Sequence, residues 1–316
     1  MQRYVLRRVL ITFPILLGIT VLCYLILSLT PGDAVTMLIS PSLTAADIEI
    51  KRKALGLDDP VYVRYLKWLN ELAHGNLGYS FSSGAPVTKR IGERILPTLT
   101  LTVTALVISY LFAIPIGMVA ATRRYSWVDY VATFFAFVGI SLPTFFLGLV
   151  GIYTFALRLR WLPVGGTMTL GGAGGLLDSL HHLILPAVVL AGAGGGVLVR
   201  HVRSSMLEVL GQDYVRTARA KGLAELIVLR RHALRNALIP VVTLAGLQIP
   251  ALLAGAVITE QIFEWPGMGR LTIEAINQRD YPVLMGITLI AAVLVAAGNL
   301  LADLAYSVVD PRIRYE

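Results

Sequence analysis

The chain has 316 residues, of which 56% are hydrophobic and only 15% charged, and it carries a net charge of +8. Soluble domains contain about 25% charged residues, whereas several apolar runs here reach the roughly 20 residues that a membrane-spanning helix needs. An ordinary soluble domain is therefore excluded, and the positive charge indicates membrane topology rather than nucleic-acid binding. The single cysteine, Cys23, excludes an internal disulfide and a cysteine-rich metal site. We predict an all-α polytopic membrane protein.

The first apolar run, Val9 to Leu29, follows three arginines and so resembles a signal peptide. It is longer than a signal sequence requires and has no small-residue cleavage site near its end, so we predict a retained anchor. The mostly polar residues 32–96 come next and are predicted to form a small external domain. Within them we expect helices at Ala45–Leu55 and Val61–Ala73.

Its glycines and its aromatic residues lead to two further predictions for this segment. Gly75, Gly78 and Gly84 are predicted to mark turns. Its aromatic residues are predicted to form a small core or a membrane-interface belt rather than a binding surface. These residues are Tyr62, Tyr65, Trp68, Tyr79 and Phe81.

Five more apolar segments are predicted to span the membrane. They are Pro97–Ala121, Tyr130–Leu157, Leu183–Val199, Ala237–Ile262 and Val283–Val309. Pro115 is expected to kink the second span, and Ser141, Pro143 and Thr144 interrupt the third. Four glycines at positions 192, 194, 195 and 196 are expected to admit close helix approach in the fourth.

The glycine-rich residues 158–182 are predicted to form a mobile external loop. His181 and His182 are adjacent at its end and so do not share a helix face. We therefore expect a solvated loop end rather than a metal site.

Six spans place both termini on one side of the membrane. On that arrangement the termini and the loops on their side hold 15 basic residues, whereas the two short loops on the other side hold four. Basic residues concentrate on the cytoplasmic side, and the long segment 32–96 is left out because long segments cross largely regardless of charge. The termini are therefore predicted to be cytoplasmic.

One charged stretch, Glu208 to Pro240, lies between two apolar segments. Its arginines cannot lie in lipid without a cost of several kcal/mol each. Asp213 is a plausible N-cap, and Gly222 offers a helix stop because glycine adopts the left-handed conformation readily. We predict two short helices, joined by a glycine turn, at the membrane face. The alternative is a basic loop that only obeys topology rules.

This stretch resembles the EAA loop of ABC importer permeases, the segment that docks into the ATP-hydrolysing subunit. Arg216, Thr217 and Ala218 stand at the E-A-A positions, Gly222 is the motif glycine, and His232 and Leu234 stand at its I and L positions. The resemblance implies an ATPase-coupling loop within residues 206–240, whose central part, residues 213–235, we call the coupling elbow. Ala218 is expected to face the partner, where a small residue admits close approach. The coupling residues predicted are Asp213, Tyr214, Arg216, Thr217, Ala218, Arg219, Lys221, Gly222 and His232.

The resemblance extends over nearly the whole chain. YVRTARAKG with RHALRNALIPVVT, LTPGDA after the first span, GISLPTF in the third, EQIFEWPGMGR before the last and the tail DPRIRYE are all similar to the B-type permease subunit of dipeptide and oligopeptide importers. In that family the GISLPTF motif lies along the translocation path, although here such a polar break also fits a simple packing kink. Residues predicted to line the path are Ser141, Pro143, Thr144, Gln248 and Asn299.

The resemblance implies a division into an N-terminal span (1–31), an external domain (32–96) and a permease core (97–316). It also implies a multi-pass protein of the bacterial cytoplasmic membrane. The expected partners are a distinct C-type permease, ATP-binding subunits and an external solute-binding protein, besides membrane lipid, with no nucleic acid. The sequence has no G-x-x-x-x-G-K-[ST] motif, so no cofactor is expected on this chain, and ATP with magnesium belongs to the partner subunit.

Other functions remain open from the sequence. Related permeases carry glutathione or nickel, so the solute is not fixed. A secondary transporter would be expected to carry carboxylates near mid-membrane, whereas Asp303 is the only acid well inside a predicted span and lies near its end. An intramembrane enzyme would need paired acids, a serine–histidine pair or a metal motif, and none is found.

Overall fold

A computed structural model describes residues 2–30, 49–50, 52–53, 56–169, 171–172, 174–254 and 256–309. Within these ranges the chain is helical and forms no strand, apart from an isolated bridge between Tyr79 and Pro86. It divides into two compact units. The first comprises Met1–Thr98, Leu253–Val257 and Pro266–Glu316, and the second comprises Leu99–Leu252 and Ile258–Trp265.

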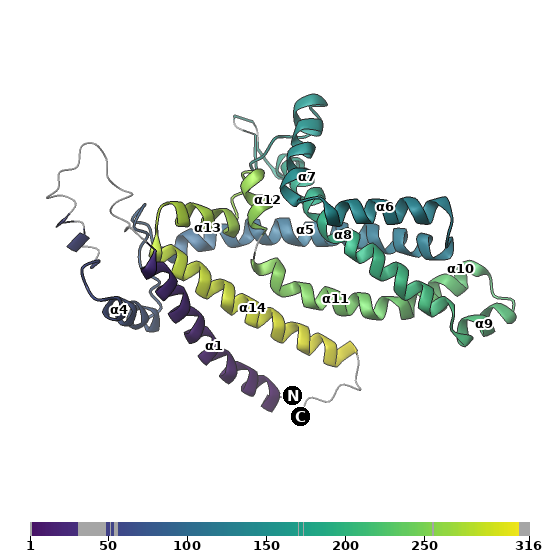
Figure 1. The fold of residues 1–316 in the computed structure, drawn as a ribbon, viewed down its shortest axis with the longest axis horizontal. Helices are drawn as coiled ribbons and strands as arrows, with labels where there is room; N and C mark the ends of the chain where they lie inside the picture. Colours follow the sequence, from purple (N-terminus) through teal and green to yellow (C-terminus); the bar gives the residue numbers. More distant parts are fainter. Residues whose placement is uncertain are drawn as a thin grey trace. The chain divides into compact units, whose positions relative to one another are not determined.

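The first unit is built on two long apolar helices, α1 (Gln2–Leu29) and α14 (Tyr281–Val309), which lie side by side (Figure 1). The beginning of α5 (Val87–Thr122) and α13 (Met268–Asn277) complete its core. Val87, Ile91, Leu271 and Val283 are fully buried there. Gly286 lets α14 approach α5 closely, since a Cβ at this position would lie 2.6 Å from Val87 Cγ1.

The segment predicted to be external carries α4 (Val61–Ala73), whose bounds agree with the predicted helix. Gly75, Gly78 and Gly84 all have positive φ, which confirms the predicted turns. Most of the helix expected at Ala45–Leu55 lies outside the described residues, but its described parts, 49–50 and 52–53, are helical.

The aromatic residues of this segment form a small packed group only in part. Tyr65 lies 5.4 Å from the Tyr24 ring and 6.1 Å from the Trp68 ring, between centroids. Tyr62 and Tyr79, in contrast, are 68% and 59% exposed. Tyr65 and Trp68 are therefore half-buried in a small aromatic cluster, while Tyr62 and Tyr79 lie on the surface, and the choice between a core and an interface belt stays a prediction.

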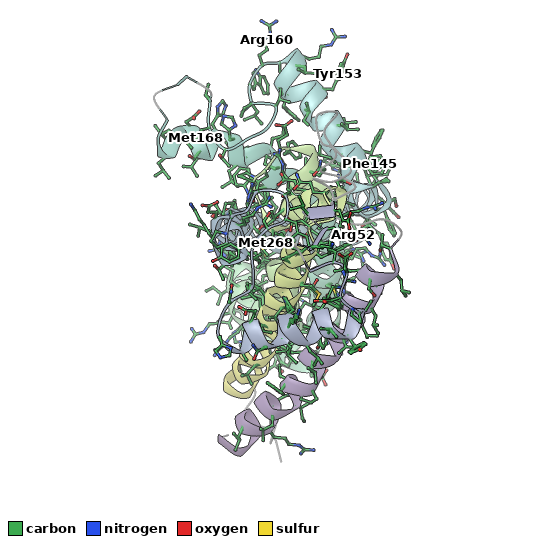
Figure 2. All side chains as sticks on the ribbon, turned by 90° about the vertical axis from the view of Figure 1, so that its left-hand side faces the viewer. Arg52, Phe145, Tyr153, Arg160, Met168 and Met268 are labelled. Carbon is green, nitrogen blue, oxygen red and sulfur yellow. The ribbon has the colours of Figure 1, made fainter. Side chains whose placement is uncertain are left out.

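The second unit contains the rest of α5 and the helices that follow it. These are α6 (Trp127–Ser141), α7 (Thr144–Gly151), the π-helical η1 (Ile152–Arg158), α8 (Leu176–Leu210), α9 (Asp213–Ala220), α10 (Glu225–Ile227), the π-helical η2 (Val228–Leu234), α11 (Arg235–Ala254) and most of α12 (Val257–Ile262). Figure 1 shows α6 running along α8. Tyr153 and Arg160 lie at the tip of the η1 segment (Figure 2).

The sequence predicts that all four glycines of α8 admit close helix approach. The structure shows this for only some of them. A Cβ on Gly196 would lie 2.3 Å from the Ala136 carbonyl oxygen of α6. A Cβ on Gly192 or Gly194 would meet nothing within 4 Å, and one on Gly195 only Ser109 Oγ at 4.0 Å. The prediction is confirmed for Gly196 and wrong for Gly194, because only every third or fourth residue of a helix faces the same neighbour.

Four helices are long and apolar enough to cross a membrane among the described residues, namely Leu6–Leu29, Val87–Thr122, Leu176–Leu210 and Tyr281–Leu300. A fifth crossing results if Trp127–Ser141 and Thr144–Arg158 count as one span bent by 106°. The chain is therefore a multi-pass helical protein, while the predicted sixth span and the orientation of the termini stay predictions.

The described part of the loop before α8 makes hydrogen bonds to that helix, and the predicted mobility of the loop stays a prediction. His182 is only 5% exposed, and its Nδ1 and Nε2 lie 2.8 Å from Gly165 O and 3.3 Å from Thr169 Oγ1. Thr169 also donates from its backbone and side chain to Asp178. The prediction of a solvated end was wrong for His182, because α8 begins at Leu176 and carries His182 against the folded-back loop. Among the described residues no cluster of three metal ligands exists.

Candidate functional site

The coupling elbow begins with α9, which ends in a Schellman motif. The Gly222 N–H donates to Arg219 O at 2.9 Å, and the Leu223 N–H donates to Ala218 O at 3.4 Å. This pair of bonds requires a left-handed conformation at the residue that follows the C-cap. That residue is Gly222, which has φ +76°. The predicted glycine stop is confirmed.

The N-terminal end of α9 differs by one residue from the prediction. The N-cap is Gln212, whose carbonyl accepts from the N–H groups of Val215 and Arg216 at 3.1 and 3.3 Å. The prediction of Asp213 as N-cap was wrong. Asp213 instead occupies the first helical position, where its negative charge interacts favourably with the helix dipole. Its Oδ1 lies 3.5 Å from Arg216 Nη1.

The second short helix predicted after Gly222 is not a separate element. The α-helical turn α10 passes into η2 and then into α11, with Val228 and Arg235 both in right-handed helical conformation at the junctions. At its other end, α9 is separated from α8 by Gly211 and Gln212 alone. Short non-helical connections, residues 211–212 and 221–224, therefore join α9 to the long helices on either side.

The elbow has an apolar core of its own. Val215, Ala218 and Val228 are buried against one another, and Val209 and Leu210 of α8 pack against them. Ala218 is 5% exposed, so its small side chain admits η2 rather than a partner. The expectation that Ala218 faces the partner was therefore wrong, because its position facing η2 depends on how the chain returns after Gly222.

The outer surface of the elbow is basic. Arg216 and Arg219 are exposed on α9 and Lys221 is exposed at its C-cap. The cations of the next segment, Arg230, Arg231 and Arg235, are exposed as well. Arg219 donates to both Glu225 carboxylate oxygens, at 2.7 and 3.1 Å. These hydrogen bonds, together with the Arg219 charge, hold the pKa of Glu225 below its usual value. The exposed surface of the elbow is therefore net positive.

The remaining predicted coupling residues join α9 to the start of α11. Asn236 Nδ2 donates to the Tyr214 hydroxyl at 3.3 Å and to His232 O at 3.0 Å. Thr217 Oγ1 donates to Asp213 O at 2.9 Å, which occupies its hydroxyl within α9. Tyr214 and His232 therefore lie close together.

The residues predicted to line a path fall into separate places. Ser141, Pro143 and Thr144 lie together at the break between α6 and α7, where the pair bends by 106°. Gln248 is half-buried on α11 of the second unit, and Asn299 is exposed on α14 of the first. Their role in a pathway stays a prediction.

One residue pair that sequence reasoning missed joins α6 to α8. The carboxylate of Asp129, on α6, receives Arg203 of α8 at 2.6 and 2.8 Å, and also accepts from the Tyr125 N–H. The side chain of Ser126 caps α6 by accepting from the Asp129 N–H. The Ser-x-x-Asp spacing is a capping-box signal, but nothing in the sequence joined it to Arg203, which was counted as a topology charge.

A multi-pass helical membrane protein is the class that these features define. The description "binding-protein-dependent transport system inner membrane component" matches residues 113–315, and the N-terminal description of the same transport systems matches residues 1–102. The chain belongs to this family, which confirms the resemblance found in the sequence.

Curated relatives match the chain over its full length. It is 48% identical over 316 residues, all of both chains, to the oligopeptide transport system permease protein AppB of Bacillus subtilis strain 168. It is 46% identical to a putative peptide permease protein of Brucella suis, over 99% of each chain. It is 41% identical to the glutathione transport system permease protein GsiC of Salmonella choleraesuis, again over all of both chains.

A solved structure shares the fold. The MetNI methionine ABC transporter in an inward-facing conformation contains a chain that matches 70% of this one and is itself covered to 96%, with TM-score 0.54 and 16% identity. At that identity the likeness concerns the fold alone.

Proposed function

We propose that this chain is the permease subunit of an ATP-driven peptide importer and forms half of its translocation pathway. The observation that carries the proposal is the coupling elbow, which is continuous with α11 and two residues from α8. The name of the relative at 48% identity, an oligopeptide permease, supports the solute class. ATP hydrolysis belongs to a separate subunit, with ATP and magnesium bound there.

In this proposal the motor subunit contacts the basic surface of α9 and drives α8 and α11 together. The ATP cycle of the motor shifts the population between outward-facing and inward-facing access. A distinct C-type permease supplies the other half of the path, and an external solute-binding protein delivers the solute. Ser141, Pro143 and Thr144 would line the path at the α6–α7 break, together with Gln248 and Asn299.

Uptake assays with the intact transport system test the solute class. Membrane vesicles that contain this chain and its accompanying subunits should accumulate labelled tri- to pentapeptides when ATP and the binding protein are supplied. ATP-independent uptake would contradict the ABC mechanism. Uptake of glutathione in preference to peptides would favour the second candidate, which the 41% identity to a glutathione permease supports.

The proposed six-span topology is tested separately by cysteine labelling. Asn70 on α4 and Arg124 between α5 and α6 are both exposed, so a cysteine at either position disturbs little packing. In a background with Cys23→Ser, Asn70→Cys should react with a membrane-impermeant maleimide in intact cells, and Arg124→Cys only after the cells are opened. External labelling of position 124 would contradict the topology.

A further inference from the structure

A small cavity in the first unit lies where the end of α1 meets α4 and the start of α14. Its volume is about 180 Å³, and its walls include Tyr24, Arg64, Lys67, Trp68, Tyr281 and Met285. A single buried water needs roughly 10–15 Å³ on this measure, so the cavity has room for a larger polar group. It is smaller than the roughly 300–1,000 Å³ of typical small-molecule pockets.

Two hydrogen-bond donors on the cavity wall have no acceptor. Arg64 Nε and Trp68 Nε1 are both buried, and neither makes a hydrogen bond within the part of the chain that the structure describes. An unpaired buried donor is destabilising, more so when it is charged, so native proteins retain few of them. Both groups only donate. The acceptors of the wall, which include the Asp59 carboxylate, therefore leave these two donors unmatched.

The charge of the wall specifies further which acceptor would match them. Lys67 Nζ lies 2.6 Å from Asp59 Oδ2, so these two charges compensate each other. Arg64 then leaves one positive charge on the cavity wall. An oxyanion with several oxygens meets both the charge and the two donors, because guanidinium groups bind carboxylate and phosphate oxygens strongly.

The surroundings of the cavity are those of a membrane surface. A second, smaller cavity shares Tyr24, Arg64 and Tyr281 with the first and continues past Leu27 and Ser28 of α1. On the same helix Ile26 is 65% and Leu29 is 81% exposed. Tryptophan and tyrosine are enriched at the level of lipid headgroups, and α1 ends here at Leu29.

We propose that this cavity binds a phosphate group, with Arg64 and Trp68 donating hydrogen bonds to its oxygens, and that the phosphate is that of a membrane phospholipid. The acyl chains then lie along the exposed apolar side of α1 near Ile26 and Leu29. Inorganic phosphate offers the same chemistry from solution, and it lacks the chains that this apolar surface would cover.

Native mass spectrometry of the delipidated full-length chain, with the subunits that purify with it, tests the site. Dioleoyl phosphatidylglycerol is added in one arm, a phosphate-free galactosyl diacylglycerol in the second, and inorganic phosphate in the third. Arg64→Met keeps the aliphatic stem and should weaken phosphatidylglycerol retention about tenfold. Trp68→Phe keeps a ring, removes the N–H and should weaken retention about threefold to fivefold.

Matched controls come from the other unit. Arg160 extends outward at the tip of the η1 segment (Figure 2), and Trp161 is 64% exposed. Arg160→Met and Trp161→Phe should retain lipid as the unaltered chain does. Equal retention in Arg64→Met and Trp68→Phe, or equal retention of the galactolipid, would overturn the site. Arg64-dependent binding of inorganic phosphate without lipid retention would overturn the lipid as its source.

Discussion

Arg203 donates two hydrogen bonds to the Asp129 carboxylate, from Nε to Oδ1 at 2.6 Å and from Nη2 to Oδ2 at 2.8 Å. The pair joins the start of α6 to α8, upstream of the coupling elbow. The Asp129 side chain is 4% exposed and that of Arg203 is 27% exposed. The two side chains therefore hold α8 against α6 close to the end of α8, which α9 follows.

Removing one partner of this pair is expected to destabilise the protein strongly. Asp129→Ala leaves the guanidinium without its acceptor, and breaking a buried pair costs about 3–5 kcal/mol. We expect about 3 kcal/mol, because Arg203 retains some access to solvent. In a double-mutant cycle of thermal unfolding in detergent, Asp129→Ala with Arg203→Ala should cost less than the sum of the two single changes. Strict additivity would show that the pair contributes nothing.

The contact between α6 and α8 at Gly196 is expected to tolerate no side chain. A Cβ there would lie 2.3 Å from the Ala136 carbonyl oxygen, so Gly196→Ala should lower the free energy of unfolding by about 1–3 kcal/mol through overpacking. Gly194→Ala is the matched control, since its Cβ would meet nothing within 4 Å, and it should be neutral or stabilising. Equal unfolding midpoints for the two variants would contradict this packing.

Local signals in the sequence predicted α4 and the glycine stop, because both depend on nearby residues. The apolar cores of the spans were also recognisable, since a membrane helix must satisfy its backbone internally. The buried position of Ala218 could not be predicted from the sequence, because it depends on how η2 folds back over α9. Likewise, Ser141 and Pro143 predicted that the helix is interrupted there, but the size of the bend, 106°, depends on what packs around α7.

Long-range pairs account for the other differences. A histidine can be either solvated or buried, so the sequence does not decide the environment of His182. The loop decides it, because the loop folds back and places Gly165 O beside the His182 ring. Asp129 and Arg203 lie 74 positions apart, and no periodicity connects them. Sequence reasoning therefore located the candidate coupling segment but not the contacts that hold it.

Asp280 is expected to hold residues 79–86 against the start of α14. It is fully buried, accepts from the Phe81 N–H at 3.0 Å and from Ser82 Oγ at 2.9 Å, and also binds Ser80 Oγ and Arg90. Asp280→Ala leaves these donors and one cation unsatisfied, at an expected cost of about 3 kcal/mol. Residues 79–86 should then be cut faster by added protease.

A matched control for Asp280 is Asp213→Ala, since the Asp213 side chain is 97% exposed. It removes the same carboxylate from a surface position and should leave the cleavage rate within residues 79–86 unchanged. Unchanged cleavage in Asp280→Ala as well would mean that the buried carboxylate does not restrain this segment.

The Arg219–Glu225 pair predicts a pH dependence of the elbow. Hydrogen bonds from Arg219 lower the pKa of Glu225 in the folded elbow, whereas an unfolded glutamate titrates near about 4.3. Its contribution is therefore complete above the unfolded pKa and is lost as the pH falls through the lower, folded value. Hydrogen exchange of α9 amides, corrected for intrinsic rates, should show more opening between about pH 5 and pH 3.

Glu225→Gln should abolish that pH-dependent part of α9 opening, because glutamine does not titrate. Glu208→Gln removes an exposed acid of α8 and should leave the pH profile as it is in the unaltered chain. The effect is small, since exposed ion pairs contribute about 0–1 kcal/mol. An unchanged profile in Glu225→Gln would assign the opening to other groups.

The interior position of Ala218 yields the sharpest test of the coupling elbow. Ala218→Asp buries a carboxylate against Val215 and Val228, which costs several kcal/mol unless the elbow opens. Gly222→Trp places a side chain at φ +76°, a strain of about 1 kcal/mol. Because neither residue lies in a candidate span, both variants should insert into the membrane normally. Each should lose co-purification with the ATPase subunit or uncouple its hydrolysis from uptake.

Ala220→Asp is the control for Ala218→Asp, since Ala220 is exposed on the same helix and an added acid there leaves the elbow core intact. It should retain the hydrogen-exchange protection of α9 that Ala218→Asp loses. The readouts are co-purification of the ATPase subunit and solute-stimulated ATP hydrolysis in liposomes. If Ala218→Asp and Gly222→Trp both keep normal association and normal coupling, residues 213–235 are only a basic loop that follows the topology rule. The proposed role in coupling would then fail, although membership of the family would stand.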